Sequence, residues 1–144
     1  MPVQNKTVDG VQLVRRSYRM LDDLRKVPDG PADRLLRELV HERFELHLPP
    51  VYPDTQIFRG ADGLKRWVVR TREVWGEWRF DVEKFIDLRE RVVVLVHLVA
   101  EGGLSGVRLE RDTAHVWTLA DGKVTRCEVY LDRAEALEAL GLKD

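Results

Sequence analysis

Hydrophobic residues recur at helical spacing in three stretches of the chain. In the first, from Thr7 to about Leu24, apolar positions lie three or four residues apart, and Thr7 stands where a helix N-cap is expected. The turn VPDGP separates this stretch from a shorter run at Ala32 to His41. We therefore expect two amphipathic helices, followed after Gly60 by a third whose apolar face holds Leu64, Trp67, Val68, Thr71, Val74, Trp75 and Trp78.

Alternating apolar and polar residues predict β-strands between and after these helices. A short strand is expected from Phe44 to Leu48, where Pro49-Pro50 ends it, and the segment VYPDTQIFRG that follows is typical of a loop. The remaining strands are expected at Phe80–Leu88, Val92–Ala100, Val107–Leu119 and Lys123–Leu131.

The chain is expected to end in a short helix. Asp132 is placed to cap it, Glu135 completes a start that resembles a capping box, and Gly141 stands where a helix-ending glycine is common. Helices followed by a run of antiparallel strands indicate an α+β fold, with the helices on one face of a curved sheet. Such a sheet leaves a mostly apolar cavity, the usual form of a small-molecule site.

The turn ADGK between the last two strands can close in two ways. A two-residue loop, Asp121-Gly122, would be a type I′ turn and would set His115 opposite Glu128. A three-residue loop that also includes Ala120, with a bulge at Gly122, would set His115 opposite Cys127. The choice decides which side chains of the two strands share a face.

Composition narrows the class of protein. The 144 residues are 44% hydrophobic and 34% charged, which describes one globular domain over residues 1–144. A net charge of −1 provides no general field that would attract nucleic acid. We expect no membrane span, because the longest apolar run, Val92 to Ala100, is too short. The start MPVQNKTVDG has no apolar signal core and Cys127 is the only cysteine, so we expect a cytoplasmic protein.

Two segments carry a resemblance to a known family. They are FRGADGLKRW at 58–67 and AHVWTLADGKVTRCEVYLDRAEAL at 114–137, and they resemble SnoaL-like members of the NTF2-like (ketosteroid isomerase-like) superfamily. The resemblance implies a cystatin-like cone, in which a curved antiparallel sheet is half-wrapped by three helices around a central pocket. It favours the three-residue loop, which would put Cys127, Val129 and Leu131 on one face with His115 and Trp117.

The resemblance also allows known catalytic patterns to be compared with this sequence. A site like that of ketosteroid isomerase needs a carboxylate base where the first strand ends, and here that strand ends at His47-Leu48. A site like that of an epoxide hydrolase needs an aspartate on the last strand, where the nearest match is Val129. A cyclase-like site needs one general acid/base near the sheet, which His115, His97 or His47 would supply.

His115 and Tyr18 are the candidate catalytic residues. An imidazole at a cavity wall offers a donor and an acceptor, and a buried tyrosine hydroxyl needs a partner. The alternative is that His115 is a structural residue whose ring nitrogens form hydrogen bonds inside the sheet or just outside it. If the two act on one ligand, we expect either replacement to weaken binding of an oxygen-bearing apolar molecule with little loss of melting temperature.

The candidate ligand contacts also have structural alternatives. Trp67 at helical spacing is commonly a core residue, His97 would otherwise point out of the sheet at a partner, and His47 alternates with apolar residues as a surface residue does. By analogy with the family, Asp54 lies near the pocket mouth, although a solvated turn residue is the simpler interpretation. The full set of candidate contacts is Trp117, His97, Trp67, His47 and Val129.

Two functions are consistent with these residues. The first is a pocket enzyme, a cofactor-independent cyclase, isomerase or lyase that acts on a small apolar oxygenated molecule with His115 as acid/base. The second is a non-catalytic binding or assembly module, a homodimer joined through the outer face of its sheet. We expect no metal site, because the histidines are scattered and the cysteine stands alone.

Overall fold

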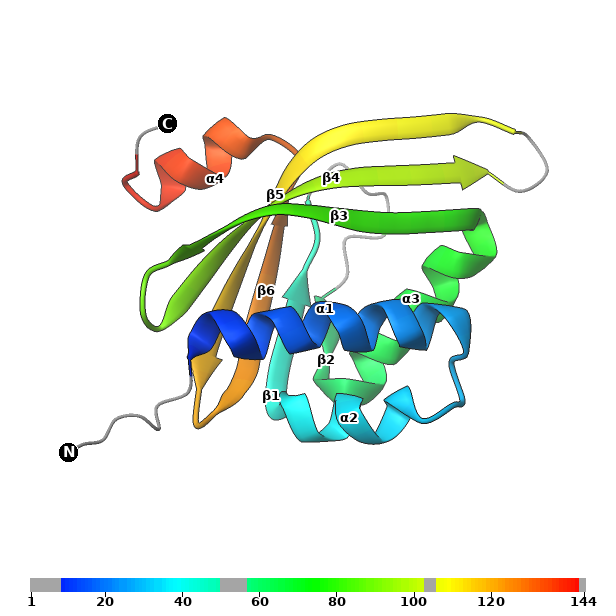
Figure 1. The fold of residues 1–144 in the computed structure, drawn as a ribbon, viewed down its shortest axis with the longest axis horizontal. Coiled ribbons are helices and arrows are strands. Elements are labelled where there is room, and N and C mark those ends of the chain that lie inside the picture. The colour runs from blue at the N-terminus through cyan, green and yellow to red at the C-terminus, as the bar shows by residue number, and fades with distance from the viewer. Residues whose placement is uncertain (1–8, 50–56, 103–105, 143–144) are drawn as a thin grey trace.

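The fold was analysed in a computed structural model, which describes residues 9–49, 57–102 and 106–142. Helices and strands alternate little along the chain: most helical residues come first and most strand residues later (Figure 1). The elements in chain order are α1 (Gly10–Lys26), α2 (Ala32–Leu39), β1 (Val40–His47), β2 (Ile57–Arg59), α3 (Gly60–Val74), β3 (Trp75–Asp87), β4 (Arg91–Gly102), β5 (Arg108–Ala120), β6 (Lys123–Tyr130) and α4 (Arg133–Ala139).

The six strands form one curved sheet in the order β2-β1-β6-β5-β4-β3. Helices α1, α2 and α3 cover its concave face, and α4 lies against the opposite face (Figure 1). The predicted α+β architecture is therefore confirmed. The expectation of a purely antiparallel sheet is wrong, because β6 returns beside β1 in the parallel direction.

The first helix begins later than its sequence predicted. Asp9 is the N-cap of α1, and its side chain accepts a hydrogen bond of 3.1 Å from the backbone N–H of Val11. Thr7, the expected cap, lies outside the described residues. The second helix ends at Leu39 rather than His41, because Val40 already pairs with Val124 as the first residue of β1.

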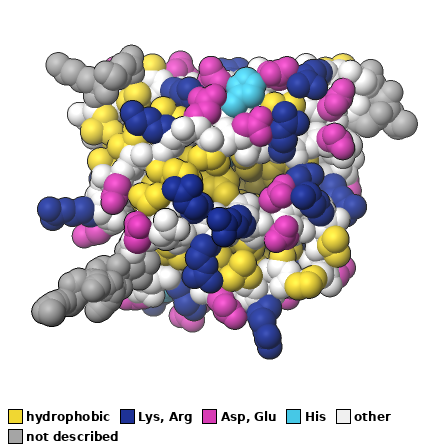
Figure 2. All heavy atoms as spheres, viewed as in Figure 1, with side chains coloured by type: hydrophobic (Ala, Val, Ile, Leu, Met, Phe, Trp, Pro, Cys, Tyr) yellow, Lys and Arg dark blue, Asp and Glu magenta, His cyan; other side chains and the backbone are white. Residues whose placement is uncertain are grey.

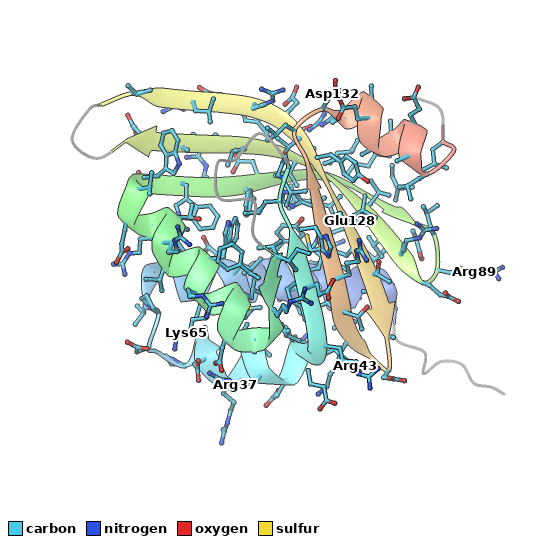
Figure 3. The ribbon with its side chains drawn as sticks, turned by 180° about the vertical axis from the view of Figure 1, so that it is seen from behind. Arg37, Arg43, Lys65, Arg89, Glu128 and Asp132 are labelled. Atoms are coloured by element: carbon cyan, nitrogen blue, oxygen red, sulfur yellow. The ribbon has the colours of Figure 1, made fainter. Side chains whose placement is uncertain are left out.

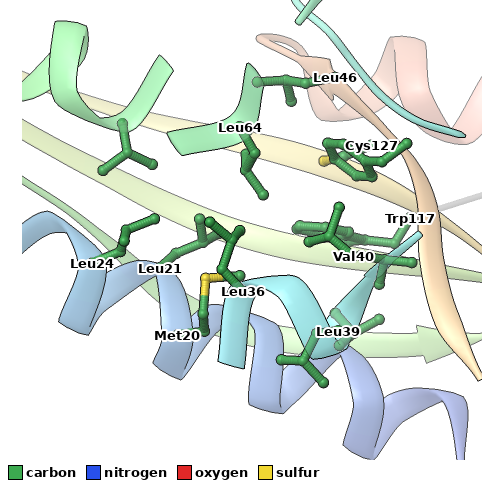
Figure 4. Packing of buried hydrophobic residues seen from close by; sticks show 14 of the residues in the cluster. Met20, Leu21, Leu24, Leu36, Leu39, Val40, Leu46, Leu64, Trp117 and Cys127 are labelled. Carbon is green, nitrogen blue, oxygen red and sulfur yellow. The ribbon is translucent and has the colours of Figure 1, made fainter. Parts of the chain in front are cut away.

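The core lies between the concave face of the sheet and the first three helices. Met20, Leu24, Leu36 and Leu64 project from the helices towards Trp117 and its neighbours on the sheet (Figure 4). All five of these side chains are almost fully buried. A second, smaller cluster packs α4 against the outer face through Val93, Ala114, Val116 and Ala136.

The expectation that Trp75 and Trp78 belong to the third helix is wrong. Helix α3 ends at Val74, and both tryptophans lie in β3, where Trp75 pairs with Gly102 and Trp78 pairs with Ala100. The spacing of three residues between them is helical, and in the strand a register shift between Trp75 and Glu77 lets both side chains line the same cavity. Pairing with β4 decides the outcome, because strand preference depends on cross-strand neighbours.

The hairpin between β5 and β6 follows neither predicted register. Its loop has two residues, Asp121 and Gly122, both with positive φ, as a type I′ turn requires. The strands then slip by one residue, because Thr118 pairs with Arg126 while Leu119 pairs with Val124. This leaves Thr125 as an unpaired bulge.

The bulge decides which residues face the concave side. It sets His115 opposite Val129 and Trp117 opposite Cys127, so the three-residue loop and the pairing of His115 with Glu128 or Cys127 are all wrong. The predicted sharing of one face by Cys127, Val129, His115 and Trp117 is confirmed, since residues directly opposite each other point to the same side.

The final helix forms as its sequence predicted. The Asp132 side chain accepts a hydrogen bond from the backbone N–H of Ala134, and Asp132 lies where β6 gives way to α4 (Figure 3). Gly141 has φ +73°, and Leu142 donates its backbone N–H to Leu137, which closes the helix end. The apolar run from Val92 to Ala100 forms part of β4, and no helix in the described ranges is long and apolar enough to cross a membrane.

Candidate ligand cavity and the His115 cluster

A cavity of about 360 Å³ opens between α3 and the concave face of the sheet. Its size falls in the range of pockets that hold small molecules. Its described walls are mostly apolar. They are formed by Leu48, Phe58, Trp67, Arg70, Thr71, Val74, Trp75, Trp78, Phe80, Leu98, Ala100, Leu109, Thr113, His115, Val129 and Leu131.

Aromatic rings form one continuous wall of this cavity. The rings of Trp67 and Phe80 are nearly parallel, with centroids 6.5 Å apart, and Trp78 meets both edge-on at 5.5 and 5.0 Å. Phe80 in turn meets His115 edge-on at 4.9 Å. These contacts hold the rings at fixed angles to one another.

His115 lies at the end of this wall and is held from behind by Tyr18. The Tyr18 hydroxyl from α1 lies 2.5 Å from His115 Nδ1, and the indole N–H of Trp117 donates to the same hydroxyl over 3.0 Å. His115 lines the cavity, whereas Tyr18 and Trp117 do not. Because Nδ1 is turned to Tyr18, Nε2 is the nitrogen that a ligand can reach.

The hydrogen bonds assign the protons of this cluster. The buried Tyr18 O–H needs an acceptor, and among the described residues His115 Nδ1 is the one within reach, so we assign the donor role to Tyr18 and the imidazole proton to Nε2. Burial lowers the pKa of His115 to about 4, and burial raises the pKa of Tyr18 well above its usual value. Near neutral pH both side chains are therefore uncharged, and His115 presents an N–H donor to the cavity.

Two further polar groups lie at the cavity wall. Trp78 is 4% exposed, and its indole N–H has no hydrogen-bond partner among the described residues. Arg70 is the one charged side chain among the described lining residues, and its guanidinium lies 5.9 Å from the Phe58 ring centroid. Neither was a predicted ligand contact, because helical spacing placed Trp78 on the third helix and no motif marks Arg70. Asp54 lies outside the described residues.

The structure separates the other predicted contacts. Trp67 and Val129 line the cavity beside His115. Trp117 is 1% exposed and lies in the core beneath the cavity. Its ring contacts Tyr18 and does not line the cavity. The bulge in β6 sets Trp117 opposite buried Cys127.

His97 and His47 lie outside the cavity. His97 is on the outer face of the sheet, where Nδ1 lies 2.8 Å from Asp112 and Nε2 lies 2.9 Å from Glu110. These carboxylates raise the pKa of His97. His47 lies 2.8 Å from Glu45 on β1, away from the described cavity walls. Neither side chain reaches His115 or its ligand space.

One group of possible metal ligands forms on the outer face, which sequence spacing did not predict. Donor atoms of Glu83, His97 and Asp112 lie within 4.8 Å of one another. The guanidinium of Arg133 lies among them, 2.6 Å from Glu83 and 3.8 Å from Asp112. Arg133 thus already supplies the positive charge that these acids need, and the cluster acts as an ion-pair network that ties α4 to the sheet.

Several solved structures have the same fold as this chain. TerC, co-crystallised with polyporic acid, is 25% identical, with a TM-score of 0.69 over 91% of this chain and 97% of that chain. An NTF2-like protein of unknown function from Burkholderia pseudomallei K96243 is 20% identical, with a TM-score of 0.72 over 92% and 97%. A candidate SnoaL-like polyketide cyclase from Jannaschia sp. CCS1 is 18% identical, with a TM-score of 0.70 over 100% and 99%.

The family follows from a match that spans most of the chain. No curated protein matches it. Residues 14–127, from the second turn of α1 into β6, match the SnoaL-like domain, and this range includes Tyr18, His115 and most of the cavity wall. With an NTF2-like cone and this match together, the chain belongs to the SnoaL-like domain family.

Proposed function

We propose that the cavity binds a small, flat, apolar molecule that carries an oxygen acceptor, and that His115 donates a hydrogen bond to that oxygen. The observation that carries this proposal is the fixed, uncharged His115 at the end of an aromatic wall, with Nδ1 bound to Tyr18 and Nε2 left for the ligand. An apolar pocket with few, well-placed polar groups is the usual arrangement for such ligands.

The proposed chemistry is a cofactor-independent cyclisation, isomerisation or elimination. His115 Nε2–H would stabilise negative charge that develops on a substrate oxygen, as an oxyanion donor does. The lowered pKa of His115 suits this role better than that of a base, because the imidazole stays neutral and keeps its proton on Nε2. Tyr18 holds the ring at one angle, which removes the cost of orienting it during the reaction.

Ligand titration tests the binding half of this proposal. Three tryptophans line the cavity, so their fluorescence reports its occupation. We expect polyporic acid, the molecule bound to TerC, or related oxygenated aromatic compounds to quench it. His115→Gln should weaken binding by about tenfold, since one hydrogen bond contributes about 1 kcal/mol or slightly more. His47→Gln, outside the cavity, is the control.

We expect ligand affinity to fall in His115→Gln and to stay unchanged in His47→Gln. Equal affinity in the wild type, His115→Gln and His47→Gln would contradict the role of His115. Turnover is followed separately by mass spectrometry of the same mixtures. A product that forms with the wild type and is absent with His115→Gln supports the proposal that the protein is an enzyme and that His115 takes part in its reaction.

The second candidate function is a binding module without chemistry. The observation that favours it is the absence of any carboxylate among the described residues that line the cavity, which leaves no evident base to remove a carbon-bound proton. Binding without turnover across the ligand panel would select this function.

In either case we propose a homodimer joined through the outer face of the sheet, which sedimentation would show as a doubled mass.

A further inference from the structure

An open groove of about 710 Å³ runs between α1 and β3, on the other side of Tyr18 from the ligand cavity. One stripe of α1 forms its first wall, and the second comes from β3, an edge strand of the sheet. The stripe from Val11 to Asp22 spans about 16 Å along the helix. The groove is lined by Val11, Arg15, Tyr18, Arg19, Asp22, Val82, Glu83, Lys84 and Phe85.

The floor of this groove is apolar. Val11, Val82 and Phe85 are each only half-buried, so they present hydrophobic surface to solvent. Figure 2 shows hydrophobic side chains between α1 and β3, with Lys and Arg side chains beside them. The guanidinium of Arg15 lies over the Phe85 ring, 4.6 Å from its centroid.

The charges in the groove are unbalanced. Both acids already have cationic partners: Asp22 pairs with Arg25 and Lys26, and Glu83 pairs with Arg133. The three cations Arg15, Arg19 and Lys84 form no ion pair within the described part of the chain. The groove therefore presents unpaired positive charge beside an apolar floor.

We propose that this groove binds a small amphiphilic carboxylate, an anionic head with an apolar chain. Arg15 and Arg19 lie one helical turn apart, so both guanidinium groups can reach one carboxylate, and Arg matches carboxylate geometry with two hydrogen bonds. The chain then lies along Val11 and Val82, beside the Phe85 ring that supports the Arg15 guanidinium. This site is separate from the cavity at His115 and does not depend on the proposed function.

Titration with decanoate, followed by backbone amide NMR shifts, tests the site. We expect shifts in residues 11–22 and 82–85, and weaker binding of decanol, which has the same chain without the charge. Shifts confined to cavity residues such as Thr113 and Val129, or equal binding of decanol, would overturn the proposal.

A pair of matched variants tests the role of the arginines. Arg15→Glu/Arg19→Glu reverses the groove charge, and Arg16→Glu/Arg34→Glu makes the same change in net charge at exposed positions outside the groove. We expect the first to lose about tenfold or more in decanoate affinity and the second to stay within about twofold. Equal losses in both would overturn the proposal. If the first variant fails to fold, Arg15→Gln/Arg19→Gln replaces it.

Discussion

Two histidines on the two faces of the same sheet show opposite electrostatic behaviour. His115 on β5 is buried on the concave face, contacts the uncharged groups of Tyr18 and Phe80, and has a pKa lowered to about 4. His97 on the neighbouring strand β4 lies on the outer face between Asp112 and Glu110, which raise its pKa. Burial thus favours the neutral form of the side chain on one face, and the two carboxylates favour the charged form on the other, because surroundings decide which form is more stable.

The largest expected effect that tests this contrast is the pH dependence set by His115. Because its folded-state pKa is lowered, the unfolded chain takes up the proton first, so stability is lost as pH falls from about 6.5 to about 4. The loss is on the order of 3 kcal/mol for a fully buried group. Urea unfolding at pH 7 and pH 4 measures it. The difference in unfolding free energy between the two pH values should be smaller in His115→Gln than in the wild type by about that amount. An unchanged pH dependence in His115→Gln would mean that burial does not keep the imidazole neutral.

Tyr18→Phe should have the next largest effect. It removes the hydroxyl that joins Trp117 and His115, and leaves the buried indole N–H and Nδ1 without a partner. We expect a loss of about 1–3 kcal/mol in unfolding free energy. From sequence, little change in melting temperature was expected, because the hydroxyl was expected to bind a ligand. In the structure it forms hydrogen bonds with two protein side chains instead.

Tyr130→Phe is the matched control for this variant. Tyr130 lies in β6, and no hydrogen bond from its hydroxyl joins it to another described residue. Its replacement should change the unfolding free energy by less than about 0.5 kcal/mol. Similar losses from the two phenylalanine variants would show that the Tyr18 hydroxyl contributes nothing specific.

His97→Gln should have the smallest effect and the opposite sign with pH. Because the folded-state pKa of His97 is raised, its contribution is present below about 6.5 and is lost as pH rises through the raised value. The variant should therefore be slightly less stable than the wild type at pH 5.5, and this deficit should be smaller at pH 9. Solvent exposure of the ion pairs keeps this effect small. Urea midpoints at the two pH values measure it, and a deficit that is larger at pH 9 would reverse the assigned sign.

Local pattern determined much of this fold. The cap at Asp132 and the end at Gly141 form as expected, because both depend on residues within one or two turns. The alternating runs became strands, and alternation alone put His115 and Trp117 on one face. The family resemblance was carried by these same local features, so the α+β cone could be predicted.

Only the tertiary structure decided what surrounds each candidate residue. The bulge at Thr125 set His115 opposite Val129, and pairing with β4 moved Trp78 from the expected helix into a strand. Packing against Tyr18 of α1 and Phe44 of β1 buried Trp117 beneath the cavity, and pairing of β4 with β5 set His97 between the acids of the outer face. The physical reason is that burial, register and hydrogen-bond partners arise from segments far apart in sequence. Residue type and spacing do not predict those partners. They therefore indicate which side chains are capable of chemistry but not which of them come into contact.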